Sequence, residues 1–194
     1  GQRPDCLLVV CSDSRVAVNV FASTEPGDMF VVRNVGNIVP PPDAKGTSEG
    51  DVSEIAAIEF GVELLEVSSV IICGHSECGA MGALISGRSS VASPHLRAWL
   101  KNAEDALDTS RFVFREHKSF PPQNLASQRN VLLQLEHLRQ YPFIAKRIAE
   151  GKLKLHGWWF DIAEAEVYAW DEDAQVFSVL DEARSNRMLD TMKE

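Results

Sequence analysis

The sequence has no long apolar run. Its longest apolar stretches, such as the one within 68–74, are far shorter than the roughly 18 residues that cross a bilayer. It also lacks an opening segment in which positive charge precedes an apolar run, as a secretion signal requires. We therefore expect a cytoplasmic protein. The opening residues 1–10 run almost at once into a predicted strand, which suggests that an upstream segment has been removed.

Positive charge is also scarce. The chain has 19 lysines and arginines against 28 aspartates and glutamates, a formal net charge of -9 at pH 7. No basic run could bind a phosphate backbone or an anionic membrane, so neither nucleic acid nor a membrane is expected as a partner. At 194 residues and 45% hydrophobic composition, the chain can bury a core of ordinary size. We expect a single domain over 1–194.

Cysteine is equally scarce, with only Cys6, Cys11, Cys73 and Cys78. Four cysteines are too few for a disulfide framework in a chain of this length, so reduced thiols or metal ligands are expected. Cys6 and Cys73 lie in or beside apolar runs, where cysteine acts as a small buried hydrophobic residue. Cys11 and Cys78 differ, because each lies where a predicted strand has just ended.

The apolar runs predict a sheet. Those at 6–10, 29–32 and 69–73 are bounded by Pro, Gly and Asp and are typical of buried parallel strands. Later strands are predicted at 153–162, 165–170 and 175–180. The sequence therefore predicts an α/β fold with a mostly parallel central sheet flanked by helices and with late antiparallel strands at the C-terminal end.

Helical patterns separate the strands. Residues 51–67 predict a crossover helix, with Asp51 or Ser53 available as its N-cap. The apolar stripe of this helix consists of Ile55, Ile58, Val62 and Leu65. The proline-rich stretch 39–50 predicts an exposed loop. The helical segments that we expect to cover the sheet are 94–107 and 123–151.

A metal site is predicted at the strand ends. His75 and Cys78 follow the strand at 69–73 and have the His-x-x-Cys spacing that lets two ligands converge on one ion. Cys11 follows another strand, and the carboxyl ends of neighbouring parallel strands meet at one crevice. Zn²⁺ accepts two cysteines and one histidine, and three protein ligands leave a fourth position for water, as in catalytic sites.

No fourth protein ligand is evident. Cys73 would point away from the site if it lies in the strand. The other histidines, expected to be exposed or to have satisfied core positions, are His95, His117, His137 and His156.

Asp13 and Arg15 leave the same strand as Cys11. Unpaired charge beside a buried strand end is costly, so we expect an ion pair that keeps the Asp13 carboxyl ionised. Asp13 could then accept a hydrogen bond from a zinc-bound water. Two thiolate ligands cancel the charge of the ion, which predicts activity that favours alkaline pH.

The segments CSDSR at 11–15 and HSECG at 75–79 resemble the two signature motifs of the β-class carbonic anhydrases, in the same order. The resemblance continues through 25–39, 56–67 and 141–162. It implies a zinc lyase, with one Zn²⁺ per chain, that interconverts carbon dioxide and bicarbonate through a zinc-bound hydroxide. It also implies an α/β fold that works as a homodimer or higher homo-oligomer, with the active site at the dimer interface. Upstream helices that embrace the partner in the family would be missing here.

Site residues follow from the resemblance. Cys11, His75 and Cys78 match the zinc ligands, and Asp13 and Arg15 match the catalytic dyad. The positions implied to bind substrate are Gln2, Phe30, Val35, Phe60 and Gly79.

Two positions depart from the family pattern. Phe60 stands where plant-type members carry Tyr, so a hydroxyl is missing. Leu8 stands where members with a regulatory bicarbonate site carry Trp, so we expect this chain to lack that site and to keep Asp13 off the zinc at neutral pH. Two alternatives remain: hydrolysis of carbon disulfide or carbonyl sulfide on the same fold, and a catalytically silent zinc-binding subunit. The physiological role of the bicarbonate stays open.

Overall fold

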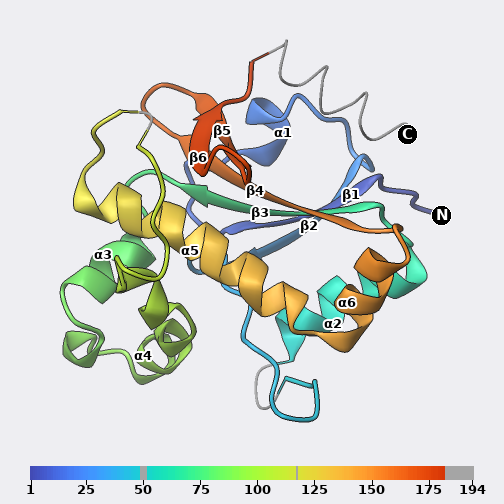
Figure 1. Cartoon of the computed structure of the whole chain (residues 1–194), viewed down its shortest axis with the longest axis horizontal. Coiled ribbons are helices and arrows are strands. Elements are labelled where there is room, and N and C mark those ends of the chain that lie inside the picture. Colours follow the sequence, from blue (N-terminus) through green and yellow to red (C-terminus); the bar gives the residue numbers. More distant parts are fainter. Residues whose placement is uncertain (49–51, 117, 182–194) are drawn as a thin grey trace.

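A six-stranded sheet runs through the molecule in the order β2-β1-β3-β4-β5-β6 (Figure 1). The computed structural model describes residues 1–48, 52–116 and 118–181. The strands are β1 (Cys6–Cys11), β2 (Met29–Asn34), β3 (Ser69–His75), β4 (Lys154–Asp161), β5 (Glu166–Asp171) and β6 (Val176–Val179). β1 to β4 pair as parallel neighbours, whereas β5 pairs antiparallel with both β4 and β6. The predicted mostly parallel α/β fold with late antiparallel strands is therefore confirmed.

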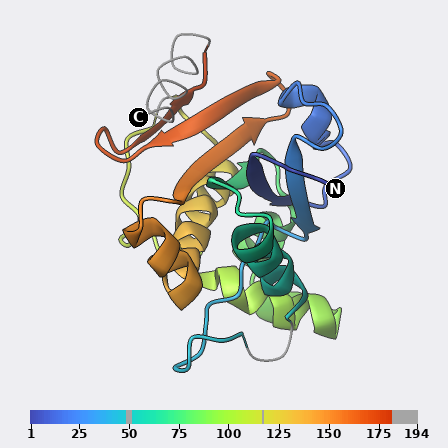
Figure 2. The same cartoon turned by 90° about the vertical axis from the view of Figure 1, so that its right-hand side faces the viewer.

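Helices cover the sheet. They are α1 (Val18–Phe21), α2 (Ser53–Glu59), α3 (Gly79–Ile85), α4 (Pro94–Leu100), α5 (Pro122–Arg139) and α6 (Pro142–Ala149). Short irregular turns of helix are η1 (Phe60–Leu64), η2 (Arg88–Ser90) and η3 (Lys101–Leu107). In Figure 2, α2, α5 and α6 lie on the same side of the sheet. None of the helices in the described part of the chain is long and apolar enough to cross a membrane.

The two faces of β1 pack into different clusters because successive strand residues point to opposite sides. Leu7 and Val9 join the core beneath α2, α5 and α6. Leu8 and Val10 lie in the cluster on the opposite face together with Cys73. Cys73 thus points away from the cluster that holds Cys11, as expected.

β1 and β3 are longer than their apolar runs. β1 ends at Cys11, which pairs with Asn34, and β3 ends at His75, which pairs with Phe160. Pairing with β2 extends β1, and pairing with β4 extends β3, beyond the last residue of each apolar run. Two candidate ligands therefore lie on the rigid last residues of strands rather than in loops after them.

The predicted crossover helix is shorter than 51–67 and has a different start. Val52 is its N-cap, with no side-chain capping bond, and Ser53 is already helical, so the prediction of a Ser53 cap is wrong. Asp51 lies outside the described residues. The apolar stripe is confirmed, because all four of its residues pack in the core or against it.

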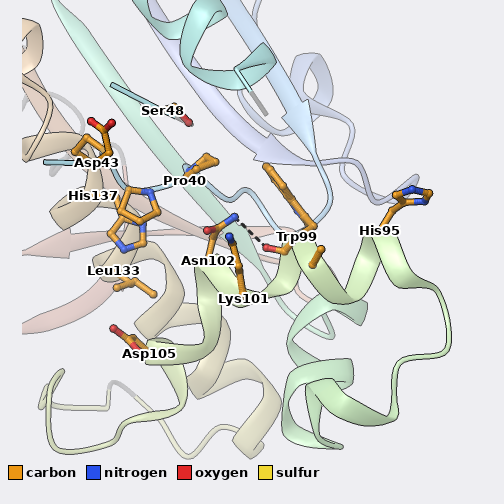
Figure 3. A pocket seen from close by; sticks show the side chains of 13 residues that line it. Pro40, Asp43, Ser48, His95, Trp99, Lys101, Asn102, Asp105, Leu133 and His137 are labelled. Atoms are coloured by element: carbon orange, nitrogen blue, oxygen red, sulfur yellow. Dashed lines mark hydrogen bonds between the residues drawn. The ribbon is translucent and has the colours of Figure 1, made fainter. Parts of the chain in front are cut away.

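The prediction of an exposed loop at 39–50 is wrong at its start. Val39 and Pro40 are buried, because the Val39 N–H donates to Gln134 Oε1 and the Pro40 carbonyl accepts from the Tyr141 hydroxyl. Polar side chains of α5 and its following turn hold these residues, which a proline count does not reveal. The loop then borders a cavity of about 650 Å³ that Trp99 and His137 also line (Figure 3).

Candidate metal centre

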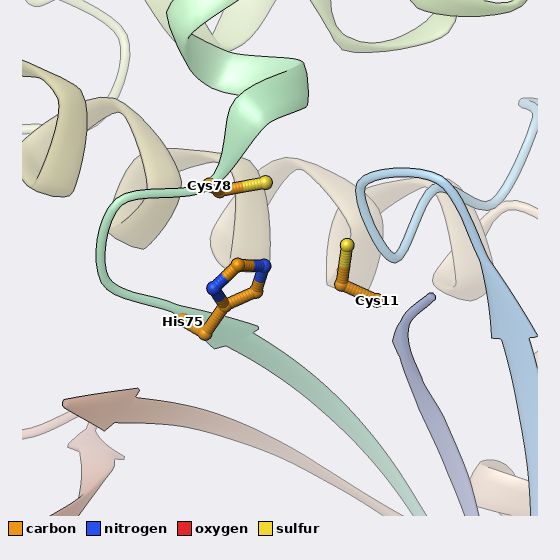
Figure 4. Close-up of side chains that lie close together, drawn as sticks. All are labelled: Cys11, His75 and Cys78. Carbon is orange, nitrogen blue, oxygen red and sulfur yellow. The ribbon is translucent and has the colours of Figure 1, made fainter. Parts of the chain in front are cut away.

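Three donor side chains converge at the carboxyl ends of β1 and β3. One ligand atom each from Cys11, His75 and Cys78 lies within 4.8 Å of the other two, and all three residues are buried (Figure 4). β1 and β3 are adjacent parallel strands, and Cys78 is the N-cap of α3. The strand order therefore brings together residues 64 positions apart in the sequence, as predicted.

The His75 ring is oriented for a metal. Its Nδ1 lies 2.8 Å from the Ser76 carbonyl oxygen. A carbonyl can only accept, so Nδ1 carries the proton and Nε2 presents a lone pair. Nε2 is buried and has no hydrogen-bond partner among the described residues. A buried acceptor without a donor, facing two sulfurs, fits a zinc ion.

The two thiols influence each other. The Cys78 thiol, hydrogen-bonded to Cys11, lowers the pKa of Cys11 against the opposing effect of burial, and contacts with His75 and the Gly36 N–H lower it further. The same contact raises the pKa of Cys78. Cys11 is therefore the sulfur that more readily supplies a thiolate donor.

One peptide group connects Cys11 to a tryptophan. The Gly36 N–H donates to Cys11 Sγ over 3.3 Å, and the Val35 carbonyl of the same peptide accepts from Trp99 Nε1 over 2.7 Å. Gly36 adopts a φ of 84°, and a Cβ there would lie 3.0 Å from the Cβ of Ala80. Hydrogen bonds in series polarise one another, so Trp99 strengthens the bond that stabilises the sulfur.

Asp13 and Arg15 form the expected ion pair. Arg15 Nη2 donates to Asp13 Oδ2 over 2.9 Å, and Arg15 Nη1 donates to Glu77 Oε2 over 2.9 Å. The Arg15 hydrogen bond holds the pKa of the Asp13 carboxyl well below its usual range. Asp13 Oδ2 lies 3.9 Å from His75 Nε2, so an ionised carboxylate stands next to the ligand set.

Arg33 is a contributor that the sequence patterns did not indicate. Its Nη2 donates to the carbonyl oxygens of Cys11, Asp13 and Val16 at 2.9, 3.1 and 3.0 Å. One guanidinium on β2 therefore holds the backbone on which Cys11 and Asp13 stand. Arg33 lies within the stretch 25–39 that resembles the family, but a lone arginine in a strand carries no motif.

The residues implied to bind substrate fall into two groups. Val35 follows β2 at the ligand end, and Gly79 directly follows Cys78. Phe30 lies near the start of β2 opposite Leu7, four residues or roughly 13 Å before the level of Cys11. The Phe60 ring lies 5.9 Å from the Phe30 ring, and Gln2 precedes β1. The fold of one chain therefore does not bring Gln2, Phe30 and Phe60 to its own metal centre.

His95, His137 and His156 lie outside the donor group. His95 is exposed on α4, whereas His137 is buried with its Nδ1 bonded to the Val39 carbonyl. His156 is half-buried, and its Nε2 has no partner among the described residues, which corrects the expectation of a satisfied position. His117 lies outside the described residues.

Comparison with known proteins identifies the family. Residues 6–167 match the sequence pattern of a family described as carbonic anhydrase. The solved structure of the β-carbonic anhydrase CcaA has a TM-score of 0.81 and 38% identity, covering 94% of this chain and 80% of that one. The chain belongs to the β-carbonic anhydrase family. Zinc is the metal of this family, and the sulfur and imidazole donors found here suit it.

Two further relatives show the extent of the match. A carbonic anhydrase of Synechocystis is 42% identical over 88% of this chain, and the chain spans 61% of the length of that relative. A tetrameric β-carbonic anhydrase from the filamentous ascomycete Sordaria macrospora is 30% identical, with a TM-score of 0.73 over 87% of this chain and 81% of that one.

Proposed function

We propose that the chain catalyses the reversible hydration of carbon dioxide to bicarbonate and a proton, with one zinc ion held by Cys11, His75 and Cys78. The observation that carries this proposal is the set of three buried donors beside an ionised carboxylate. Three protein donors leave one tetrahedral position for water, which is the pattern of a catalytic zinc site.

The residues of the chain orient the reaction. Zinc, when bound, would act as a Lewis acid that lowers the pKa of a coordinated water toward neutrality. Asp13, held ionised by Arg15, accepts a hydrogen bond from the attacking water and directs a lone pair of that water toward the carbon of carbon dioxide. Arg15 at the same time keeps the carboxylate from turning onto the metal. Attack yields bicarbonate, and the released proton passes to buffer.

Carbon dioxide has no net dipole, so an apolar wall suits it. Val35 is half-exposed at the ligand end of β2. Gly79 contributes open space, because no atom beyond its chain neighbours and its own helix backbone lies within 4 Å of the place that a Cβ would take there. These two residues supply the part of the substrate pocket that one chain can build.

A partner subunit supplies the rest of the pocket. Gln2, Phe30 and Phe60 lie at the opposite end of the strands from Cys11, where they serve the site of a second copy. The tetrameric assembly of the Sordaria relative supports a homo-oligomer. The test is to mix Cys11→Ser subunits with Phe30→Ala/Phe60→Ala subunits. Partial recovery of activity is expected, because one site of each mixed dimer is then intact, and no recovery would contradict shared sites.

The deciding experiment for the reaction is stopped-flow carbon dioxide hydration on protein of measured zinc content. Rates that scale with zinc content are expected. Turnover of carbon disulfide or carbonyl sulfide without carbon dioxide hydration would instead support the hydrolase alternative. A silent subunit is disfavoured, because Asp13 and Arg15 are both present and paired. The cytoplasmic location and the absence of a regulatory bicarbonate site stay predictions.

A further inference from the structure

One face of α5 contacts residues 75–78, here called the ligand loop, which runs from His75, the last residue of β3, to Cys78, the N-cap of α3. Gln123 Nε2 donates to the Cys78 carbonyl, and Ser127 Oγ donates to the His75 carbonyl, each over 2.8 Å. Asn124 Oδ1 accepts from the Glu77 N–H, also over 2.8 Å. Three side chains of one helix therefore bind three of the four residues of the ligand loop.

Two of these three side chains, Asn124 and Ser127, are buried. Asn124 is 7% exposed and Ser127 is 1% exposed. Ser127 Oγ also accepts from Trp159 Nε1 over 3.2 Å, so a second side chain fixes its hydroxyl. Water competes poorly for the buried bond from Ser127 to the His75 carbonyl, and the loss of Ser127 Oγ leaves that carbonyl without this partner.

α5 approaches the end of β3 unusually closely. A Cβ on Gly74 would lie 2.8 Å from Val131 Cγ2 and 3.1 Å from Ser127 Oγ. Only glycine fits at this contact. The distance between α5 and the end of β3 is thus set by packing.

The loop is not in a relaxed shape. Glu77 has a φ of 54°, in the left-handed region that a side chain other than glycine adopts at a cost. Asn124 holds the N–H of this residue, and Arg15 Nη2 donates to its carbonyl over 3.3 Å. The turn at Glu77 lets the chain curl between His75 and Cys78.

We infer that Gln123, Asn124 and Ser127 are positioning residues, which hold the loop 75–78 in the shape that presents His75 Nε2 and Cys78 Sγ to one ion. This inference rests on the zinc site of the proposed function. It goes beyond the ligand motif, because α5 begins 44 residues after Cys78 and contributes no ligand. Removal of such supporting bonds commonly weakens metal binding by 10- to 100-fold.

The test compares zinc affinities by competition with a chelator. Asn124→Ala is expected to bind zinc about 10- to 100-fold more weakly than the parent protein. Its cobalt(II)-substituted form should show altered visible bands, because the ligand geometry changes. Ser127→Ala and Gln123→Leu are independent variants with the same expected direction, so the test survives if Asn124→Ala fails to fold.

A control variant separates positioning from general stability. Gln134 is also buried on α5, but its hydrogen bonds go to Val39, Asn102, Asn130 and His137 rather than to residues 75–78. Gln134→Ala should lower stability while its zinc affinity and cobalt spectrum match those of the parent. Equal zinc affinity of Asn124→Ala, Ser127→Ala, Gln123→Leu and the parent would overturn the inference.

A second substitution tests whether Asn124 acts through the strained backbone of Glu77. Glycine adopts the left-handed conformation freely, so Glu77→Gly relieves the need for the Asn124 bond. The loss of zinc affinity from Asn124→Ala should therefore be smaller in the Glu77→Gly background than in the parent. An equal or larger loss would contradict this account. If the parent protein binds zinc without hydrating carbon dioxide, the proposed reaction is wrong, and the affinity comparison still decides the inference.

Discussion

Arg15 binds Asp13 through two parallel hydrogen bonds, with Nε–Oδ1 at 3.0 Å and Nη2–Oδ2 at 2.9 Å. The Arg15 backbone N–H adds a third bond to Oδ1 at 2.9 Å. Bidentate pairs of this kind fix orientation as well as charge. Both carboxylate oxygens are thus engaged, and the carboxylate plane is set relative to the metal ligands.

Asp13→Asn should lower kcat/KM for carbon dioxide hydration by roughly 10²- to 10³-fold, because the amide cannot replace an ionised acceptor next to the attacking water. Zinc content should be unchanged, since Asp13 is not one of the three donors. Stopped-flow hydration with metal analysis measures both. Asp173→Asn, on the exposed turn before β6, is the matched control and should keep full activity. Full activity of Asp13→Asn would show that another group orients the water.

Arg15→Leu should let Asp13 take the open metal position, because Oδ2 already lies 3.9 Å from His75 Nε2. The cobalt(II) form of this variant should lose the spectral response to added thiocyanate that an open site gives. Carbon dioxide hydration should fall at least as far as in Asp13→Asn. The double variant Arg15→Leu/Asp13→Asn should regain the thiocyanate response, since no carboxylate remains to bind. If the single variant responds like the parent, Arg15 does not keep Asp13 off the metal.

The ligands could be predicted from the sequence because each lies at or just after the point where an apolar strand pattern ends. Cys11 and His75 come just after apolar runs, and the carboxyl ends of neighbouring parallel strands meet at one edge of the sheet. The ion pair followed from the cost of unpaired charge at that place. The apolar pattern predicts parallel strands but not their order, and only the structure shows that β1 lies between β2 and β3.

The supporting residues could not be predicted, because their partners are distant in sequence and their types are common. Asn124 reaches Glu77 over 47 residues, and Trp99 reaches Val35 over 64. A helical asparagine or tryptophan has many ordinary uses, so only the packing of α5 and α4 reveals these contacts. Register likewise decides that Phe30 stands opposite Leu7, far from Cys11.

Zinc should stabilise the fold by mass action, because the three donors form one site only in the folded chain. Zinc at about 1,000 times its Kd should add about 4 kcal/mol, or roughly 10 °C in Tm for a chain of this size. Thermal unfolding with and without a chelator measures the shift. Cys11→Ser should lose most of the shift. Cys6→Ser, at the other end of the same strand, should keep it. An equal shift in Cys11→Ser would remove Cys11 from the ligand set.

Trp99→Phe removes the indole N–H that donates to the Val35 carbonyl. The N–H bond from Gly36 to Cys11 Sγ should weaken, and sulfur electrons should transfer more easily to the metal. The sulfur-to-cobalt charge-transfer band should therefore move to longer wavelength, with a stability loss of about 1 kcal/mol. Trp170→Phe, on β5, should leave the band in place. An unshifted band in Trp99→Phe would mean that the peptide between Val35 and Gly36 does not transmit the effect of the Trp99 hydrogen bond to Cys11.

His137 should make the fold less stable in mild acid. Burial lowers its pKa below 6.5, and the positive charge of Arg111 adds to the effect, whereas its bond to the Val39 carbonyl opposes it. An unfolded histidine titrates near 6.5. As pH falls below about 6.5, His137 takes up a proton in the unfolded chain but stays neutral in the folded chain. The free energy of unfolding therefore falls until the pH reaches the pKa of His137 in the folded chain.

His137→Gln removes this titration and keeps a side-chain N–H that can donate to Val39. Urea unfolding between pH 7 and 5, in excess zinc, should show a smaller loss of stability in the variant than in the parent. Comparison at each pH cancels the contribution of zinc release, which both proteins share. His95→Gln, exposed on α4, should follow the parent at every pH. The same slope in His137→Gln and the parent, or an NMR titration of His137 at or above pH 6.5, would show that the buried ring accepts a proton in the folded state.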